Sequence, residues 1–151
     1  MKTEIISEHL WKYFELHSQQ RLTLFNYYIA VSGALISAIG FCLQAEKDLN
    51  FLVIALSFLL IIFSFLFYKL DQRTSFLIKR CEKCMVILEQ NINSQDINLF
   101  TEDNVDLNIS NNGKFFNKIL TYGFIFRLAY FLISMLSFIF IIYIGVYLKN
   151  G

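Results

Sequence analysis

The chain has 151 residues, of which 56% are hydrophobic and only 17% are charged, and its mean hydropathy is +0.52. Soluble globular domains are nearer about 45–50% apolar and about 25% charged, so this composition excludes an ordinary soluble domain. The formal net charge of +1 gives no basis for direct nucleic-acid binding, and three cysteines do not make a secreted disulfide framework.

The N-terminal segment, residues 1–21, is interpreted as a cytoplasmic amphipathic helix and not as a signal peptide. It contains three glutamates and lacks a continuous apolar stretch. Apolar residues recur at helical spacing from Ile6 to Phe14, which is typical of a helix lying on a membrane or on a neighbouring protein. His17 and Arg21 are four residues apart and share a helix face, so we expect them in a polar cytoplasmic collar.

Three apolar segments are long enough to cross a bilayer, which takes roughly 20 residues of helix. They are residues 22–44, 51–68 and 128–148. The alternative for each is a buried helix of a soluble protein, but three such segments in one short chain leave too little polar surface to cover them. The chain also has no proline, which favours long uninterrupted helices. We therefore expect an all-α membrane protein with three transmembrane helices in a single domain.

Small residues distinguish the first span from the other two. They recur three and four positions apart and form a stripe that allows two helix backbones to approach closely. The stripe and the amide beside it are the candidate oligomer interface or pore lining: Asn26, Ala30, Gly33, Ala34, Ser37 and Gly40. Two alternatives stay open, namely that the stripe packs on the chain's own second and third spans, and that Asn26 lies in the headgroup region.

The second span is predicted to continue into the cytoplasm as one helix from about residue 50 to about residue 91. Beyond residue 68, small and apolar residues are spaced 4, 3, 4, 3 and 4 positions apart, as in a coiled coil. This predicted seam of the cytoplasmic collar comprises Leu70, Thr74, Leu77, Cys81, Cys84 and Leu88. Residues 69–119 are thus assigned to a cytoplasmic helix and a polar loop, with at most one short helix near residues 96–100.

The Cys81-x-x-Cys84 motif lies on the predicted seam. A thioredoxin-like motif needs a βαβ setting, and a zinc site needs four ligands, neither of which accompanies it. We interpret the two cysteines as packing residues, with an intersubunit metal or redox site as the alternative. No cofactor, metal ion or catalytic residue is expected.

Lysine and arginine residues predict the orientation. Ten lie in the N-terminal segment and in the loop after the second span, against two in the first loop and the C-terminal tail. The positive-inside rule then places the N-terminus and the middle loop in the cytoplasm and the C-terminus outside the inner membrane. Lys69, Arg73, Arg80 and Arg127 are assigned as membrane-surface charges. For Arg127, contact with lipid phosphates is favoured over pairing with Asp71 or a role in a pore or partner site.

Three stretches carry a family resemblance: HSQQRLTLFNYYIAVSGALISAIG, FYKLDQRTSFLIKRCEKC and LTYGFIFRLAYFLI. In layout and junction residues the chain resembles small bacterial membrane proteins encoded beside anti-phage systems. These include SLATT-type transmembrane effectors and the octameric membrane-pore accessory of type VI CRISPR systems. The third span departs from a plan with two spans. The resemblance implies a membrane effector that permeabilises or depolarises the host membrane when a partner senses infection.

The sequence therefore predicts a homo-oligomeric inner-membrane pore or membrane-disrupting effector and not an enzyme. Its expected partners are membrane lipids, further copies of itself and a cytosolic protein from the same operon. The alternative is a non-conducting anchor or scaffold that recruits a cytosolic defence enzyme through the collar. A subunit of a transporter is a third reading.

Overall fold

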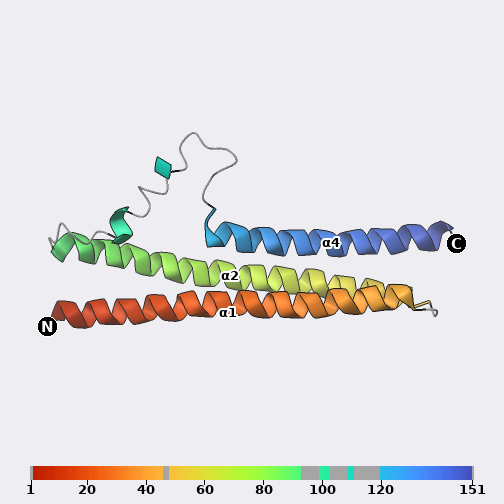
Figure 1. Ribbon diagram of the computed structural model, residues 1–151, viewed down its shortest axis with the longest axis horizontal. Coiled ribbons are helices and arrows are strands. Elements are labelled where there is room, and N and C mark those ends of the chain that lie inside the picture. Colours follow the sequence, from red (N-terminus) through yellow and green to blue (C-terminus); the bar gives the residue numbers. More distant parts are fainter. Residues whose placement is uncertain (1, 46–47, 93–98, 103–108, 111–119, 151) are drawn as a thin grey trace. The chain divides into compact units, whose positions relative to one another are not determined.

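Three long helices make up the computed structural model of the chain (Figure 1). They are α1, Lys2–Gln44, α2, Asn50–Ile92, and α4, Tyr122–Asn150. The structure describes residues 2–45, 48–92, 99–102, 109–110 and 120–150, and all regular structure within them is helical. Each long helix contains a stretch long and apolar enough to cross a membrane. The predicted all-α class and the three apolar helices are thus confirmed.

The helices α1 and α2 are each 43 residues long, which corresponds to about 65 Å. That is about twice the roughly 30 Å thickness of the hydrocarbon layer of a bilayer. The predicted single helix from about residue 50 to about residue 91 is confirmed by the bounds of α2. Residues 2–21 do not form a separate helix, because they are the first half of α1. Neither helix contains a proline that would end it.

Contacts within the chain divide it into two compact units. The span unit comprises residues 22–72 and 123–151, and the head unit comprises residues 1–21 and 73–122. The helix α1 therefore contributes its first half to the head unit and its second half to the span unit. The boundary between the units at residue 21 coincides with the predicted start of the first span. The boundaries at residues 72 and 122 lie within about six residues of the predicted end of the second span and the predicted start of the third span.

The core of the span unit is formed by all three long helices. Ile39 and Cys42 of α1, Val53 and Leu60 of α2, and Ile144 of α4 form one buried apolar cluster. Small hydroxyl side chains lie between the helices and are buried: Ser32, Ser57, Ser64 and Ser137. Small residues at a helix contact allow close backbone approach, so serines perform within the protomer the role expected of glycine and alanine.

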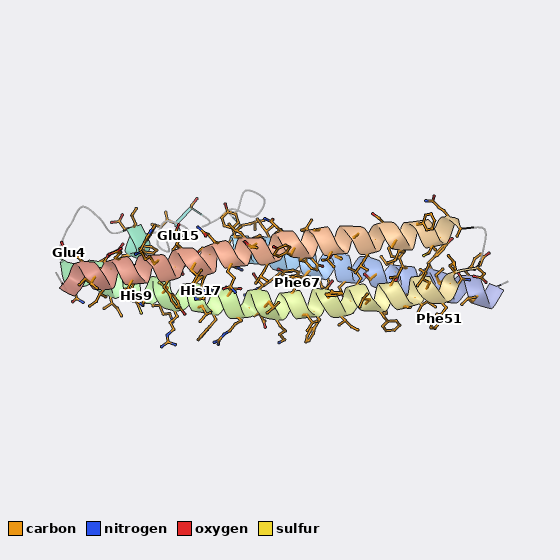
Figure 2. The ribbon with its side chains drawn as sticks, turned by 90° about the horizontal axis from the view of Figure 1, so that it is seen from below. Glu4, His9, Glu15, His17, Phe51 and Phe67 are labelled. Carbon is orange, nitrogen blue, oxygen red and sulfur yellow. The ribbon has the colours of Figure 1, made fainter. Side chains whose placement is uncertain are left out.

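Aromatic side chains form a second buried cluster in the span unit. Phe25 of α1 stacks on Phe126 of α4 with 4.0 Å between the ring centroids. Tyr28 meets Tyr130 of α4 edge to face at 4.6 Å, and it also contacts Phe67 of α2 at 5.4 Å; Phe67 is labelled on its helix in Figure 2. Tyr28 thus contacts both other helices of the span unit.

A hydrogen bond inside this cluster also links α1 to α2. The hydroxyl of Tyr28 lies 2.9 Å from the hydroxyl of Ser64. Ser64 in turn donates to the carbonyl oxygen of Leu60, one turn earlier in α2, at 2.8 Å. The phenol is fully buried, and a buried hydroxyl needs such a partner to offset its desolvation.

Candidate functional site

The small-residue stripe of the first span is exposed on the surface of the span unit. Asn26, Ala30, Gly33, Ala34 and Ser37 are exposed. Gly40, the last residue of the stripe, is half-buried. The opposite positions of α1 are the ones that enter the core. The sequence left open that this small-residue face packs on the chain's own second and third spans. In the structure it does not, because the face is exposed.

Space around the glycines shows how open this face is. A Cβ atom added at Gly33 or Gly40 would meet no atom within 4 Å in the described part of the chain, outside its own helix backbone. The hydroxyl of Ser37 donates to the carbonyl oxygen of Gly33 at 2.9 Å and so turns back onto its own helix. The face is accordingly smooth, because no long side chain projects from its centre, and a second helix backbone has room to pack there.

The head unit buries a face of α2 that differs in part from the predicted seam. Thr74 and Cys81 are buried and Cys84 is exposed, as is Leu70 near the end of the span unit. Leu77 and Leu88 are half-buried. Three further residues complete the buried face of this part of α2: Ser75, Ile78 and Met85. The packed face is thus rotated relative to the predicted seam, and the collar as an assembly stays a prediction.

The two cysteines of the Cys-x-x-Cys motif occupy different environments. The Sγ atom of Cys81 donates to the carbonyl oxygen of Leu10 at 3.2 Å and so links α2 to α1 within the head unit. Burial raises the pKa of the Cys81 thiol, and its acidic and thiol neighbours raise it further. A raised pKa lowers the thiolate fraction and hence the reactivity. Cys81 is therefore a buried packing residue, whereas Cys84 is exposed in the single chain.

Glu89, near the end of α2, anchors a short helical turn at residues 99–102. Its carboxylate accepts the backbone N–H groups of Phe100 and Thr101 at 3.0 and 3.1 Å, and the Thr101 hydroxyl at 2.8 Å. The ring of Phe100 also meets Phe14 of α1 edge to face at 5.7 Å. Residues 99 and 100 fall in the predicted short helix near 96–100, and residues 96–98 lie outside the described residues.

We expect Glu89→Gln to loosen this turn. Burial raises the pKa of the Glu89 carboxyl, but the hydrogen bonds from Phe100 and Thr101 outweigh it and hold the pKa below its ordinary value. The anchoring is thus complete above about pH 4.5 and is lost as the pH falls through the lower folded-state pKa. Limited proteolysis at neutral pH should cut the variant near residue 100 several-fold faster than the wild type, and acidification should weaken only the wild type. Equal cleavage of both proteins would show that Glu89 does not hold the turn.

His17 and Arg21, the other predicted collar residues, lie in the N-terminal half of α1, where His17 is labelled in Figure 2. The Nδ1 atom of His17 is 3.1 Å from Oε1 of Gln20, and its ring meets Tyr13 edge to face at 4.3 Å. Both residues are half-buried. The histidine is therefore held by neighbours on its own helix, as on a polar helix surface.

The four predicted membrane-surface charges are all exposed. Arg73 and Arg80 belong to the head unit, and Lys69 and Arg127 belong to the span unit. In the span unit, Arg127 Nε lies 3.8 Å from Oδ2 of Asp71. The Asp71 side chain is only 1% exposed, against 46% for Arg127. Pairing with Asp71 was one of the alternatives to phosphate contact that the sequence left open for Arg127, and the structure has it as a loose ion pair.

Sequence reasoning missed the residues that hold the three spans together. No residue of the second or third span was singled out for helix packing, yet Ser57, Ser64 and Ser137 are buried between helices. Their signal was present, since Ser57 and Ser64 are seven residues apart and therefore on one helix face. The aromatic cluster gave no such signal, because aromatic residues are frequent throughout the chain.

Comparison with known proteins gives a family and a relative. Residues 6–148 match the model of the octameric membrane protein family, and this range includes most of all three long helices. CD-NTase-associated protein 19 from Escherichia coli is 40% identical over 128 residues, which are 85% of this chain and 83% of that protein. No solved structure matches the chain significantly. The predicted resemblance to octameric bacterial membrane proteins is thereby confirmed, and the chain belongs to the octameric membrane protein family.

Proposed function

We propose that this chain is the protomer of a homo-oligomeric inner-membrane effector that permeabilises the membrane in an anti-phage defence system. The observation that carries the proposal is the exposed small-residue face of α1. Lipid contact needs no such face, because leucine, isoleucine and phenylalanine meet lipid tails equally well. Close approach of a second helix does need it. The family's description as octameric supports self-association.

Asn26 adds a reason for assembly. It is exposed on the same face as Gly33, within an apolar helix. An amide facing hydrocarbon costs free energy until it is hydrogen-bonded. In a ring, Asn26 would bond either to a neighbouring protomer or to water in a central lumen. Either environment offsets the cost, and the hydrocarbon around a lone protomer offers neither, whereas the headgroup region, the alternative position for Asn26, would offer partners without assembly.

A cytosolic trigger fits the remaining features. The excess of lysine and arginine in the N-terminal segment and the middle loop supports a cytoplasmic head unit. The relative from Escherichia coli is named as associated with a CD-NTase. By analogy, a nucleotidyltransferase or its product would act through the head unit, and the signal would pass along α1 and α2, because both helices contribute to both units.

The decisive experiment measures membrane potential with a voltage-sensitive dye in cells that express the chain together with its neighbouring genes. We expect the potential to collapse within minutes of phage infection, and to be kept in infected cells that lack this chain. Membrane fractionation and immunoblotting check that the protein is present in the membrane of the cells that express it. If triggered cells keep their potential while the protein is present in the membrane, the pore is refuted and an anchor that recruits a cytosolic enzyme takes its place.

A further inference from the structure

A groove between α2 and α4 opens on the surface of the span unit. Its volume is about 380 Å³, and its walls include Ile61 and Phe65 of α2 and Phe131 of α4. Along α2 it extends from Ile61 to Tyr68, which corresponds to about 10 Å of helix. One leaflet of a bilayer contributes about 15 Å of hydrocarbon, half of the roughly 30 Å total. The groove therefore has the length and the apolar walls to hold part of one acyl chain.

One end of this groove is cationic. Arg127 lines it, and the ammonium group of Lys69 lies over the ring of Phe65 at 5.6 Å from the centroid. Asp71 is the nearby carboxylate, but its side chain is 1% exposed and faces the protein interior. Nε of Arg127 lies 3.8 Å from Oδ2 of Asp71, and the guanidinium carries further N–H donors. Two cations and one buried carboxylate leave a net positive charge at this end.

We propose that the groove binds an anionic phospholipid, with one acyl chain along the apolar wall and the phosphate between Arg127 and Lys69. The arginine guanidinium forms bidentate hydrogen bonds with a phosphate group. In a zwitterionic headgroup, the positive charge of the headgroup itself offsets the attraction between the phosphate and these cations, so an anionic phospholipid is favoured. The order of groups in the groove, cations at one end and apolar walls beyond, matches the order in a phospholipid. The proposal depends on α2 and α4 lying in a membrane and is independent of whether the protein conducts.

Native mass spectrometry of the purified protein in detergent tests this assignment, with phosphatidylglycerol and phosphatidylcholine as probes. We expect one tightly held phosphatidylglycerol per protomer and at least tenfold weaker binding of phosphatidylcholine. Arg127→Gln and Lys69→Gln should each weaken phosphatidylglycerol binding about fivefold, as expected for removal of one cation near a lipid surface. Arg127→Lys should keep most of the affinity. Lys83→Gln, which removes an exposed cation of α2 outside the groove, is the matched control and should bind like the wild type.

Filling the groove distinguishes lipid from a second copy of the chain. Ser134 lines the groove and is half-buried, so Ser134→Trp should block the acyl chain and reduce binding of both lipids, with the oligomer intact. Equal affinity of the wild type for both lipids overturns the proposal. So does a Ser134→Trp protein that loses its oligomer but keeps its lipid, since the groove is then a subunit contact. If Arg127→Gln is shown by circular dichroism to misfold, Lys69→Gln and Ser134→Trp still decide the question.

Discussion

Replacing Gly33 with leucine is expected to break the oligomer and to abolish depolarisation while the protomer stays folded. Among the described residues, a Cβ atom at Gly33 meets no atom within 4 Å outside its own helix backbone, so the single chain accommodates the new side chain. Leucine is also a better helix former than glycine, which is about 0.8–1 kcal/mol less favourable than alanine in a helix interior, so the substitution favours α1 itself. Across a close helix contact, however, the added side chain separates the two backbones and removes the packing that drives association in lipid. We expect self-association to weaken at least tenfold.

Gly145 supplies a matched control for this substitution. It lies in α4, it is exposed, and a Cβ atom there also meets nothing within 4 Å in the part of the chain that the structure describes. Gly145→Leu therefore makes the same chemical change in a helix of the same unit without touching the small-residue face. Native mass spectrometry in detergent gives the subunit number, and the voltage-sensitive dye gives activity. An unchanged oligomer in Gly33→Leu would remove the small-residue face from the interface, and disruption by both variants would show a general effect of bulk.

The largest loss of stability is expected from Tyr28→Ala. The ring of Tyr28 is fully buried and contacts Phe67 of α2 and Tyr130 of α4. Truncating a buried aromatic side chain costs about 3 kcal/mol or more through the cavity that it leaves. The hydrogen bond to Ser64 accounts for a small part of this, because such bonds between membrane helices average about 0.6 kcal/mol. Tyr28→Phe should therefore be far milder than Tyr28→Ala.

The adjacent residue provides the control for this series. Tyr27 is 63% exposed, so Tyr27→Ala removes the same atoms from the surface and should cost less than about 0.5 kcal/mol. Unfolding in detergent micelles with increasing sodium dodecyl sulfate, followed by circular dichroism or by tyrosine fluorescence, ranks the variants. If Tyr28→Ala unfolds at the same detergent fraction as Tyr27→Ala, the aromatic cluster does not hold the three helices together.

Local pattern was sufficient to predict the helices of this protein. The absence of proline, the apolar runs of about 20 residues and the persistence of helical period beyond residue 68 all act within a few turns of chain. They predicted an all-α membrane protein, and they predicted α2 to within a residue or two of its observed ends. The stripe from Ala30 to Ser37 was equally legible, because it depends on spacing along one helix.

Which face of each helix is buried was decided only by the tertiary structure. A small residue suits a helix contact whether the partner belongs to the same chain or to another, so spacing cannot choose between them. The three helices of the span unit pack through serines and through the ring of Tyr28, and this leaves Gly33 exposed. Likewise Cys81 is buried and Cys84 is exposed, because the position of α1 relative to α2 within the head unit selects one face of the motif. Such choices depend on contacts between residues far apart in the chain, which no local pattern encodes.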